Sequence, residues 1–362
     1  MMNYTFEDKA YLWLTLADRT SLGRRNNILK LESSVETLFK TVETHRETIV
    51  RAHGEEYYSN LIKYRDLDLI NDFIDENNKR NILILTPANE NYPDSLRNID
   101  APPTALFCLG DSSLLKSRAI AVVGTRSITR YGVDVTENFT KEFVSVGLTV
   151  VSGLANGVDS VAHRTVLSEG GKTVAVSPAG LDKVYPAVNR DLFNQIAEKG
   201  LVVSEYVFGT GVKQYTFVER NRLISGLAEA VFIPEAGFPS GSLITANDAI
   251  EQGKDLFVVP GNIYGKYSAG CNKLIKDLQG AMVTEPKDVL NALGFDSDLQ
   301  PKKETQLTIE EASIINLLEK EDLHFETLLN KVGLSVKELN AILLKLELLG
   351  IIKRLPGNYF GL

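Results

Sequence analysis

Short apolar runs recur along the middle of the chain, and longer segments with apolar positions at helical spacing separate them. The first three runs are rich in Val and Ile, and this alternation is typical of parallel β-α-β units. The runs comprise residues 119–123, 148–151, 173–176, 201–203, 230–233, 256–259 and 281–283. They predict an α/β core with a sheet of about seven mostly parallel strands. Residues 81–85 and 104–109 are two further strand candidates, joined by a proline-containing connection.

Different patterns flank this core. Residues 6–78 carry apolar positions at helical spacing without a proline, which predicts several short helices. A polar, proline-containing stretch follows the core, and three helical patterns at 310–318, 325–332 and 336–349 precede a hairpin with a Pro-Gly turn. That order is typical of a winged helix. We predict a helical domain at 1–78, an α/β core at 79–294, a linker at 295–306 and a winged-helix domain at 307–362.

Composition sets the class of protein. The 362 residues carry a formal net charge of −8, and no segment is basic overall. Because salt screens surface charges beyond about 8 Å, a nucleic-acid partner would need a focused basic pocket rather than a basic face. Cys108 and Cys271 have no metal-ligand spacing, and the sequence shows neither a signal peptide nor a membrane-length apolar run. We expect a cytoplasmic protein with reduced thiols.

Small-residue turns follow the first two runs, Gly124-Thr125-Arg126-Ser127 and then a loop that contains Gly153 and Asn156. Backbone N–H groups in such turns bind anions, so phosphate is the first ligand to consider. The first turn lacks the three glycines of a dinucleotide fingerprint, and no P-loop occurs in the chain. Arg126 is either a phosphate ligand in this turn or a solvated turn charge.

Two later motifs offer further polar groups. Arg220 and Arg222 flank Asn221, which can donate to phosphate or cap a helix that starts at Leu223. The two arginines either contact a ligand or form internal ion pairs with carboxylates such as Glu205 or Glu235. Ser240-Gly241-Ser242 opens another helix, where serines cap the helix or donate to a phosphate.

Catalytic patterns are weak. His163 follows Asp159 at i+4 on a predicted helix, but no motif places a nucleophile beside it, and a packed core histidine is the favoured interpretation. Related Rossmann-like phosphoribohydrolases carry a catalytic glutamate in a P-G-G-x-G-T-x-x-E motif. Here the corresponding segment, 239–246, has no carboxylate. We expect no catalysis and no cofactor.

The motifs VGTR, VSGLANGVD, AH, GGKT, YP, SEY, RNR, SGSLIT and VPG occur in this order between residues 123 and 261. The series resembles the DprA/Smf family, the DNA-processing proteins of bacterial natural transformation, over roughly residues 81–290. The resemblance implies an extended Rossmann-like core between an N-terminal helical domain, similar to a sterile-alpha-motif or helix-hairpin-helix domain, and a C-terminal winged helix.

The resemblance also implies a pocket for single-stranded DNA. Arg126 matches the family's arginine, whereas Ala187 follows the Tyr-Pro dipeptide where the family has a basic residue. Lys183 or Arg190 would then supply that charge, and Lys266 with the two RNR arginines would carry more of the affinity. Tyr185, Phe217, Tyr264 and Tyr267 are candidates for base stacking. The candidate DNA-binding residues are Gly124, Thr125, Arg126, Ser127, Gly153, Asn156, Lys183, Arg190, Arg220, Asn221, Arg222, Ser240, Gly241, Ser242 and Lys266.

The function that the resemblance implies is protection of incoming single-stranded DNA and loading of the RecA recombinase during transformation. The implied protein partners are RecA and a second copy of the chain in a homodimer, with single-strand-binding protein as a further candidate. Residues 302–362, which include the winged helix, carry eight basic and nine acidic residues, and this balance favours protein binding or dimer support over duplex DNA. Two alternatives stay open: a Rossmann-like nucleotide hydrolase, and an adaptor whose core is only a scaffold.

Overall fold

The computed structural model describes residues 3–18, 22–295, 308–348 and 351–362. The chain divides into two compact units, residues 1–295 and 296–362. From residue 296 on, the expected linker lies outside the described residues, as do Leu349 of the last predicted helix and the residue that follows it. Within the described part, no helix combines the length and apolar character needed to cross a bilayer.

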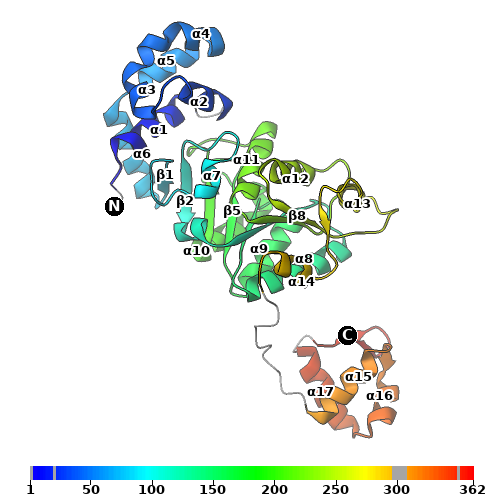
Figure 1. Cartoon of the computed structure of the whole chain (residues 1–362). Helices are drawn as coiled ribbons and strands as arrows, with labels where there is room; N and C mark the ends of the chain where they lie inside the picture. Colours follow the sequence, from blue (N-terminus) through cyan, green and yellow to red (C-terminus); the bar gives the residue numbers. More distant parts are fainter. Residues whose placement is uncertain (1–2, 19–21, 296–307, 349–350) are drawn as a thin grey trace. The chain divides into compact units, whose positions relative to one another are not determined.

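A nine-stranded sheet forms the centre of the first unit (Figure 1). Its strand order is β1-β2-β6-β5-β4-β3-β7-β8-β9. Strand β2 pairs antiparallel with both β1 and β6, and all other neighbouring strands are parallel. The strands are β1 (Leu83–Leu85), β2 (Leu106–Gly110), β3 (Ala119–Val122), β4 (Thr149–Ser152), β5 (Thr173–Val176), β6 (Leu201–Ser204), β7 (Ala230–Ile233), β8 (Asp255–Val258) and β9 (Ala281–Met282). This confirms the predicted α/β core with a largely parallel sheet.

The strand order identifies where a ligand would bind. Numbered along the chain from β3 to β9, the parallel strands lie in the order 4-3-2-1-5-6-7, the doubly wound arrangement of a Rossmann fold with one more strand beside the third. The chain reverses direction across the sheet between β3 and β7, whose residues Ile120 and Ala230 are aligned neighbours. In open α/β sheets, ligands bind outside the carboxyl ends of the strands at such a switch point.

Helices cover both faces of the sheet. Side chains of α7, α11, α12 and α13 pack on one face, and those of α8, α9 and α14 pack on the other. Helix α8 begins after Thr129, whose hydroxyl accepts a hydrogen bond from the N–H of Gly132 at 3.2 Å. The bounds are α7 (Asp94–Arg97), α8 (Arg130–Ser145), α9 (Val158–Ser168), α10 (Arg190–Lys199), α11 (Gln214–Gly226), α12 (Ser242–Glu251), α13 (Ala269–Lys276) and α14 (Pro286–Ala292), with short 3-10 turns at Ser112–Lys116 and Ala187–Asn189.

The N-terminal helices share their hydrophobic core with the sheet. Their bounds are α1 (Phe6–Ala17), α2 (Leu22–Leu29), α3 (Val35–Thr41), α4 (Arg46–His53), α5 (Glu55–Tyr64) and α6 (Leu67–Lys79), and a 3-10 turn at Val42–His45 joins α3 to α4. Trp13 and Leu61 belong to the same buried cluster as Phe107 of β2 and Val202 of β6. The helical character predicted for 6–78 is present, but these helices pack onto the core as part of one unit.

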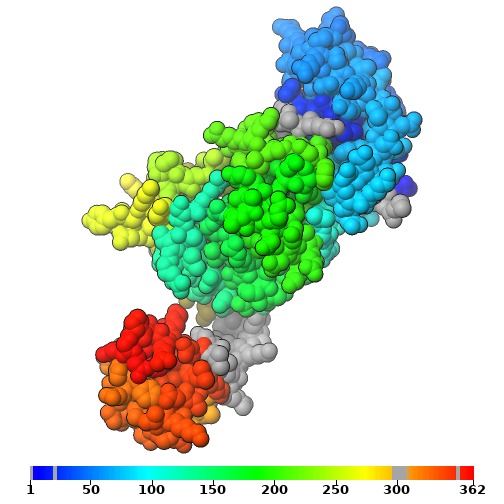
Figure 2. Space-filling view, turned by 180° about the vertical axis from the view of Figure 1, so that it is seen from behind, coloured from blue at the N-terminus to red at the C-terminus, as the bar shows by residue number. Residues whose placement is uncertain are grey.

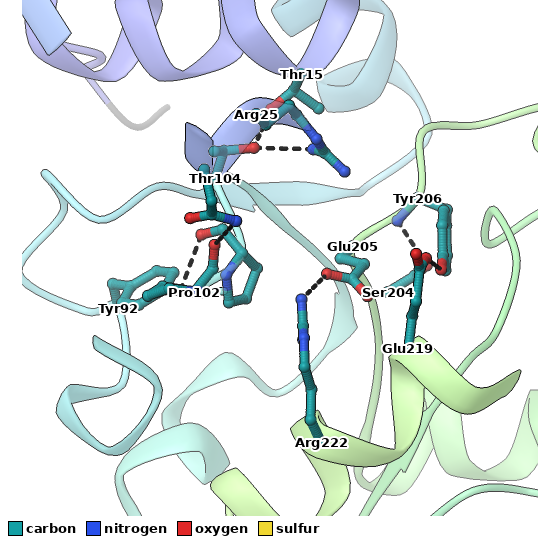
Figure 3. Close-up of polar contacts among 12 residues, drawn as sticks. Thr15, Arg25, Tyr92, Pro102, Thr104, Ser204, Glu205, Tyr206, Glu219 and Arg222 are labelled. Carbon is teal, nitrogen blue, oxygen red and sulfur yellow. Dashed lines mark hydrogen bonds and ion pairs between the residues drawn. The ribbon is translucent and has the colours of Figure 1, made fainter. Parts of the chain in front are cut away.

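A buried arginine of α2 lies where the N-terminal helices meet the sheet (Figure 3). Arg25 is 1% exposed, and its Nη1 donates to Thr104 Oγ1 at 2.8 Å, which also lies 2.8 Å from Thr15 Oγ1. Burial lowers the pKa of Arg25, and the carboxylate of Glu205 opposes that shift most strongly. The side chain of Arg25 is therefore buried between the N-terminal helices and the segment that leads into β2.

The second unit has its own hydrophobic core, which includes Ile314, Leu328 and Phe360. A capping box between Thr308 and Glu311 opens its first helix, and Gly333, in the left-handed region at φ 68°, ends the second. Its elements are α15 (Ile309–Leu318), β10 (Leu323–His324), α16 (Phe325–Val332), α17 (Val336–Leu348), β11 (Lys353–Leu355) and β12 (Tyr359–Gly361). The strands form an antiparallel sheet in the order β10-β12-β11, which completes the predicted winged helix.

Candidate functional site

A cavity of about 750 Å³, here called the Arg126 cavity, lies at the switch point between β3 and β7. The turn after β3 forms one wall, and one face of α11 forms another. The segment from residue 237 to the first turn of α12 faces them, with Lys266 and Tyr267 beside it. The cavity therefore lies where the strand order places ligand sites in this class of fold.

The turn that carries Arg126 is braced on both sides. Thr125 donates its N–H to the carbonyl of Glu235 at 2.8 Å, and its own carbonyl accepts from the N–H of Val158 at 3.2 Å. A Cβ at Gly124 would lie 2.5 Å from a Val158 methyl and 2.6 Å from the Glu235 carbonyl oxygen, so only glycine permits this close approach. The turn is thus fixed between β7 and α9.

Arg126 projects from this turn into the cavity opening and is exposed. Its guanidinium carbon lies 5.2 Å from the ring centroid of Phe217, a geometry in which the ring face attracts the cation. Tyr185 packs edge-on against the same ring, with centroids 5.2 Å apart. Among the described residues, no carboxylate forms an ion pair with Arg126. Its charge is available to an anionic ligand beside a flat aromatic surface.

Arg220 forms the buried floor of the cavity. Its Nη1 donates to the carbonyl of Gly153 at 2.6 Å and to the carbonyl of Val176, while Asp159 Oδ2 accepts from the N–H groups of Gly153 and Ala155 at 3.1 and 3.3 Å. Burial lowers the pKa of Arg220 to about 10, and Asp159 opposes that shift. Burial raises the pKa of Asp159, and Arg220 is the main opposing group. Arg220 and Asp159 each bond the backbone of the loop after β4 and so hold it in place.

The RNR motif lies inside helix α11, which corrects the expectation that Asn221 caps a helix starting at Leu223. Successive helical residues turn by about 100°, so Arg220 and Arg222 point in directions about 200° apart. Arg222 Nη2 forms an ion pair with Glu205 Oε2 at 2.7 Å (Figure 3), and the Arg222 side chain is 11% exposed. Asn221 faces the cavity and donates to the carbonyl of Gly241 at 3.4 Å. Of the two alternatives stated from the sequence, Arg222 therefore forms the internal ion pair.

The first turn of α12 closes the cavity opposite α11. Ser240 Oγ and Ser242 Oγ lie 2.8 Å apart, and the N–H of Ser242 donates to Ser240 Oγ at 3.4 Å. Lys266 is exposed, its Nζ lies 5.7 Å from the ring centroid of Tyr267, and no carboxylate of the described residues forms an ion pair with it. A second exposed cation therefore borders the cavity across from Arg126.

The structure brings ten of the fifteen candidate residues to one cavity: Gly124, Thr125, Arg126, Ser127, Arg220, Asn221, Ser240, Gly241, Ser242 and Lys266. The other five lie elsewhere. Gly153 is buried behind Arg220, Asn156 is exposed on its loop, and Arg222 pairs with Glu205. Lys183 pairs with Asp182 at 3.1 Å, and Arg190 is exposed at the start of α10.

Several further residues line the cavity that no sequence motif indicated. Gln214 and Val218 line the cavity on the same face of α11 as Phe217, and Phe238, which is 59% exposed, lines it from the segment after β7. Residues three or four positions apart share a helix face, so stepping back from Asn221 to residues 218, 217 and 214 would have identified the first two. No periodic signal identifies Phe238, because it lies in an irregular loop.

His163 lies apart from this cavity, in the core. Thr173 Oγ1 donates to the carbonyl of Val150, so its lone pair accepts from His163 Nδ1 at 2.7 Å. Burial lowers the pKa of His163 to about 3. Asp159 bonds backbone amides instead of the imidazole, so the two do not form an acid/base pair.

Comparison with known proteins identifies the family. The family model described as DNA recombination-mediator protein A matches residues 83–294, and the DprA winged helix domain matches residues 299–358. The chain belongs to the DprA/Smf family. Protein Smf of Synechocystis is 31% identical to it over 325 residues, which cover 79% of this chain and 81% of that protein.

Two solved DprA structures are similar to this one. The X-ray structure of DNA processing protein A from Streptococcus pneumoniae superposes with a TM-score of 0.67 at 31% identity, covering 80% of this chain and 98% of that one. DNA processing protein A from Helicobacter pylori, whose structure describes a single-stranded DNA binding mode, superposes with a TM-score of 0.54 at 34% identity. That match covers 58% of this chain and 95% of that one. The DprA/Smf assignment therefore rests on both sequence and fold.

Proposed function

We propose that this DprA/Smf protein binds single-stranded DNA in the Arg126 cavity, as part of DNA processing during transformation. The observation that carries the proposal is the exposed guanidinium of Arg126, unpaired among the described residues and held over the Phe217 ring at the mouth of a cavity. The single-stranded DNA binding mode described for the Helicobacter pylori relative supports the same ligand class.

The charges around the cavity favour a phosphate ligand despite the acidic chain. Arg126 and Lys266 are both exposed at its border, whereas Asp159, the carboxylate in its wall, is 6% exposed and bonded to backbone amides. Charges beyond about 8 Å are screened at physiological salt, so the overall charge of −8 does not prevent local binding. Phe217 and Tyr267 offer flat surfaces for unstacked bases.

The test is binding of a fluorescent oligo-dT strand, measured by anisotropy over a salt series for wild type and Arg126→Ala. A charge-assisted hydrogen bond contributes about 1.5–3 kcal/mol, so we expect roughly ten- to 150-fold weaker binding and a salt slope reduced by about one. Arg130→Ala is the matched control. Arg130 lies four residues away, its side chain is 86% exposed, and it pairs with Asp134 outside the cavity. We expect it to bind like wild type.

Unchanged affinity and salt slope for Arg126→Ala would refute the proposal and favour the adaptor alternative. Tight binding and cleavage of nucleoside monophosphates would favour the nucleotide hydrolase instead. We propose that the cavity has no catalytic step, because its carboxylate bonds backbone amides and the segment 239–246 lacks the glutamate of the related hydrolases.

We further propose that the protein acts in the cytoplasm as a homodimer, protects bound strands and delivers them to RecA, with single-strand-binding protein as an additional partner. The description of the matching family as a recombination mediator supports this role. The assay is RecA filament assembly on strands coated with single-strand-binding protein. We expect wild type to accelerate assembly and Arg126→Ala to accelerate it less; no acceleration by wild type would contradict the loading role.

For the winged helix we propose a protein-binding or dimer-supporting role. Lys345, one of two lysines in its third helix, pairs with Glu311 at 2.6 Å and is thereby withdrawn from a phosphate backbone. The test is duplex DNA binding by the full chain. If the wild type binds duplex DNA and Lys337→Ala abolishes that binding, this role is contradicted.

A further inference from the structure

A second cavity of about 400 Å³, here called the Tyr131 cavity, adjoins the Arg126 cavity. Lys266 and Tyr267 line both, so these two residues form the partition between them. Tyr131 and Glu235 line only the second cavity. Its volume lies within the roughly 300–1,000 Å³ typical of small-ligand sites. The strand binding proposed for the Arg126 cavity assigns no ligand to it.

The loop between β8 and α13 forms the outer wall of the Tyr131 cavity. The yellow segment that contains this loop projects from the surface of the first unit (Figure 2). Ile263 and Tyr264 on the loop are 77% and 92% exposed, which is unusual for large apolar side chains placed side by side. The Tyr131 hydroxyl donates to the carbonyl of Pro260 at 2.9 Å and so ties the base of the loop to α8.

The polar groups of this cavity disfavour a phosphate inside it. Glu235 is 3% exposed, and its carboxylate accepts from the N–H and the hydroxyl of Thr129 at 2.9 and 2.7 Å. A phosphate next to this carboxylate would meet like charge. Among the described lining residues the basic group is Lys266, and it stands at the partition.

Resting on the proposed strand binding, we propose that the Tyr131 cavity is a second subsite that takes one base of the strand. A phosphate at Lys266 has one nucleoside on each side of it, so the flanking bases enter the two cavities. Tyr131, which is 48% exposed, and Tyr267 supply the flat surfaces against which the base stacks. Stacking tolerates every base, because all four present a π-face.

The test crosses two variants of Tyr131 with two strands, an oligo-dT and a strand of the same length made of abasic nucleotides. For Tyr131→Leu we expect roughly five- to 150-fold weaker binding of oligo-dT, the range for losing one stacked base, at an unchanged salt slope. The same variant should bind the abasic strand like wild type. Tyr131→Phe keeps the ring and removes only the bond to the Pro260 carbonyl, so we expect it to bind oligo-dT like wild type.

Three results would overturn the second subsite: wild-type affinity of Tyr131→Leu for oligo-dT, an equal loss on the abasic strand, or an equal loss in Tyr131→Phe. Arg126→Ala in the same series separates this inference from the proposed function. If Arg126→Ala weakens binding and Tyr131→Leu does not, only the second subsite fails. If wild type does not bind the strand, both fail.

Discussion

Replacing Arg220 by methionine tests whether the buried floor of the Arg126 cavity depends on the charge and the hydrogen bonds of this side chain. The substitution removes the donors to the Gly153 and Val176 carbonyls and leaves Asp159 buried without its main opposing charge. Each hydrogen bond from a charged group contributes about 1.5–3 kcal/mol, so losing both costs about 3–6 kcal/mol, a large share of the roughly 5–15 kcal/mol that stabilises a typical domain. We expect the free energy of unfolding to fall by that amount.

Urea unfolding of the full chain measures the effect, together with Asp159→Asn and the double variant. The asparagine retains an oxygen that accepts from the Gly153 and Ala155 amides, so we expect a smaller loss, about 1–3 kcal/mol. Because both side chains act on the same loop, the double variant should lose about 0.5–3 kcal/mol less than the sum of the single losses. Arg130→Met, at an exposed pair worth about 0.3–0.5 kcal/mol, is the control.

The pH dependence adds an independent check. Burial raises the pKa of Asp159, and loss of Arg220 removes the main opposing influence, so the pKa rises further in Arg220→Met. The folded variant then holds a proton that the unfolded chain releases, and its stability falls as the pH rises through the raised pKa. The difference in the free energy of unfolding between wild type and Arg220→Met should therefore become smaller as the pH is lowered. A loss no larger than that of Arg130→Met, or strict additivity in the double variant, would refute the reasoning.

Two further predictions follow from the structure. Between pH 6.5 and about 3 only the unfolded chain protonates His163, so this residue lowers wild-type stability by about 1.4 kcal/mol per pH unit on acidification. In urea unfolding over a pH series, His163→Gln should flatten the acid slope, and an unchanged slope would contradict the assignment. Ala187→Lys restores the basic residue of the family after Tyr185-Pro186, and we expect tighter oligo-dT binding with a salt slope larger by about one. Unchanged binding would show that position 187 does not face the strand.

Much of the fold was predictable because strands and helices carry local signals. The runs 173–176 and 230–233 coincide with β5 and β7, since each is a fully buried segment bounded by polar or small residues. The pattern at 325–332 coincides with α16, which His324 caps and Gly333 ends. The order of the strands carries no such signal, because it depends on which buried faces meet.

The site was predictable only in part, for a geometric reason. Short motifs identify turns at strand ends, and the turn with Arg126 does face the cavity. The RNR motif was predicted before a helix because three polar residues do not reveal that they lie within one. In α11, Arg220 and Arg222 lie on different faces of the helix. The Tyr131 cavity was missed because Tyr131, Glu235 and the loop before α13 are distant in sequence and meet only in the folded sheet.

The shared core of the N-terminal helices and the sheet determines how this protein can be divided into fragments. Phe73 of α6 meets the Phe107 ring of β2 edge-on at 6.0 Å, and Arg25 reaches Thr104 from the same side. A fragment that starts at residue 79 would expose the apolar side chains of the sheet that α6 covers, such as Phe107. It would also leave Thr104 without its hydrogen bond from Arg25. The winged helix buries its own apolar side chains. A boundary between residues 296 and 307 therefore leaves both apolar cores whole, whereas a boundary at residue 79 divides the core that the N-terminal helices share with the sheet.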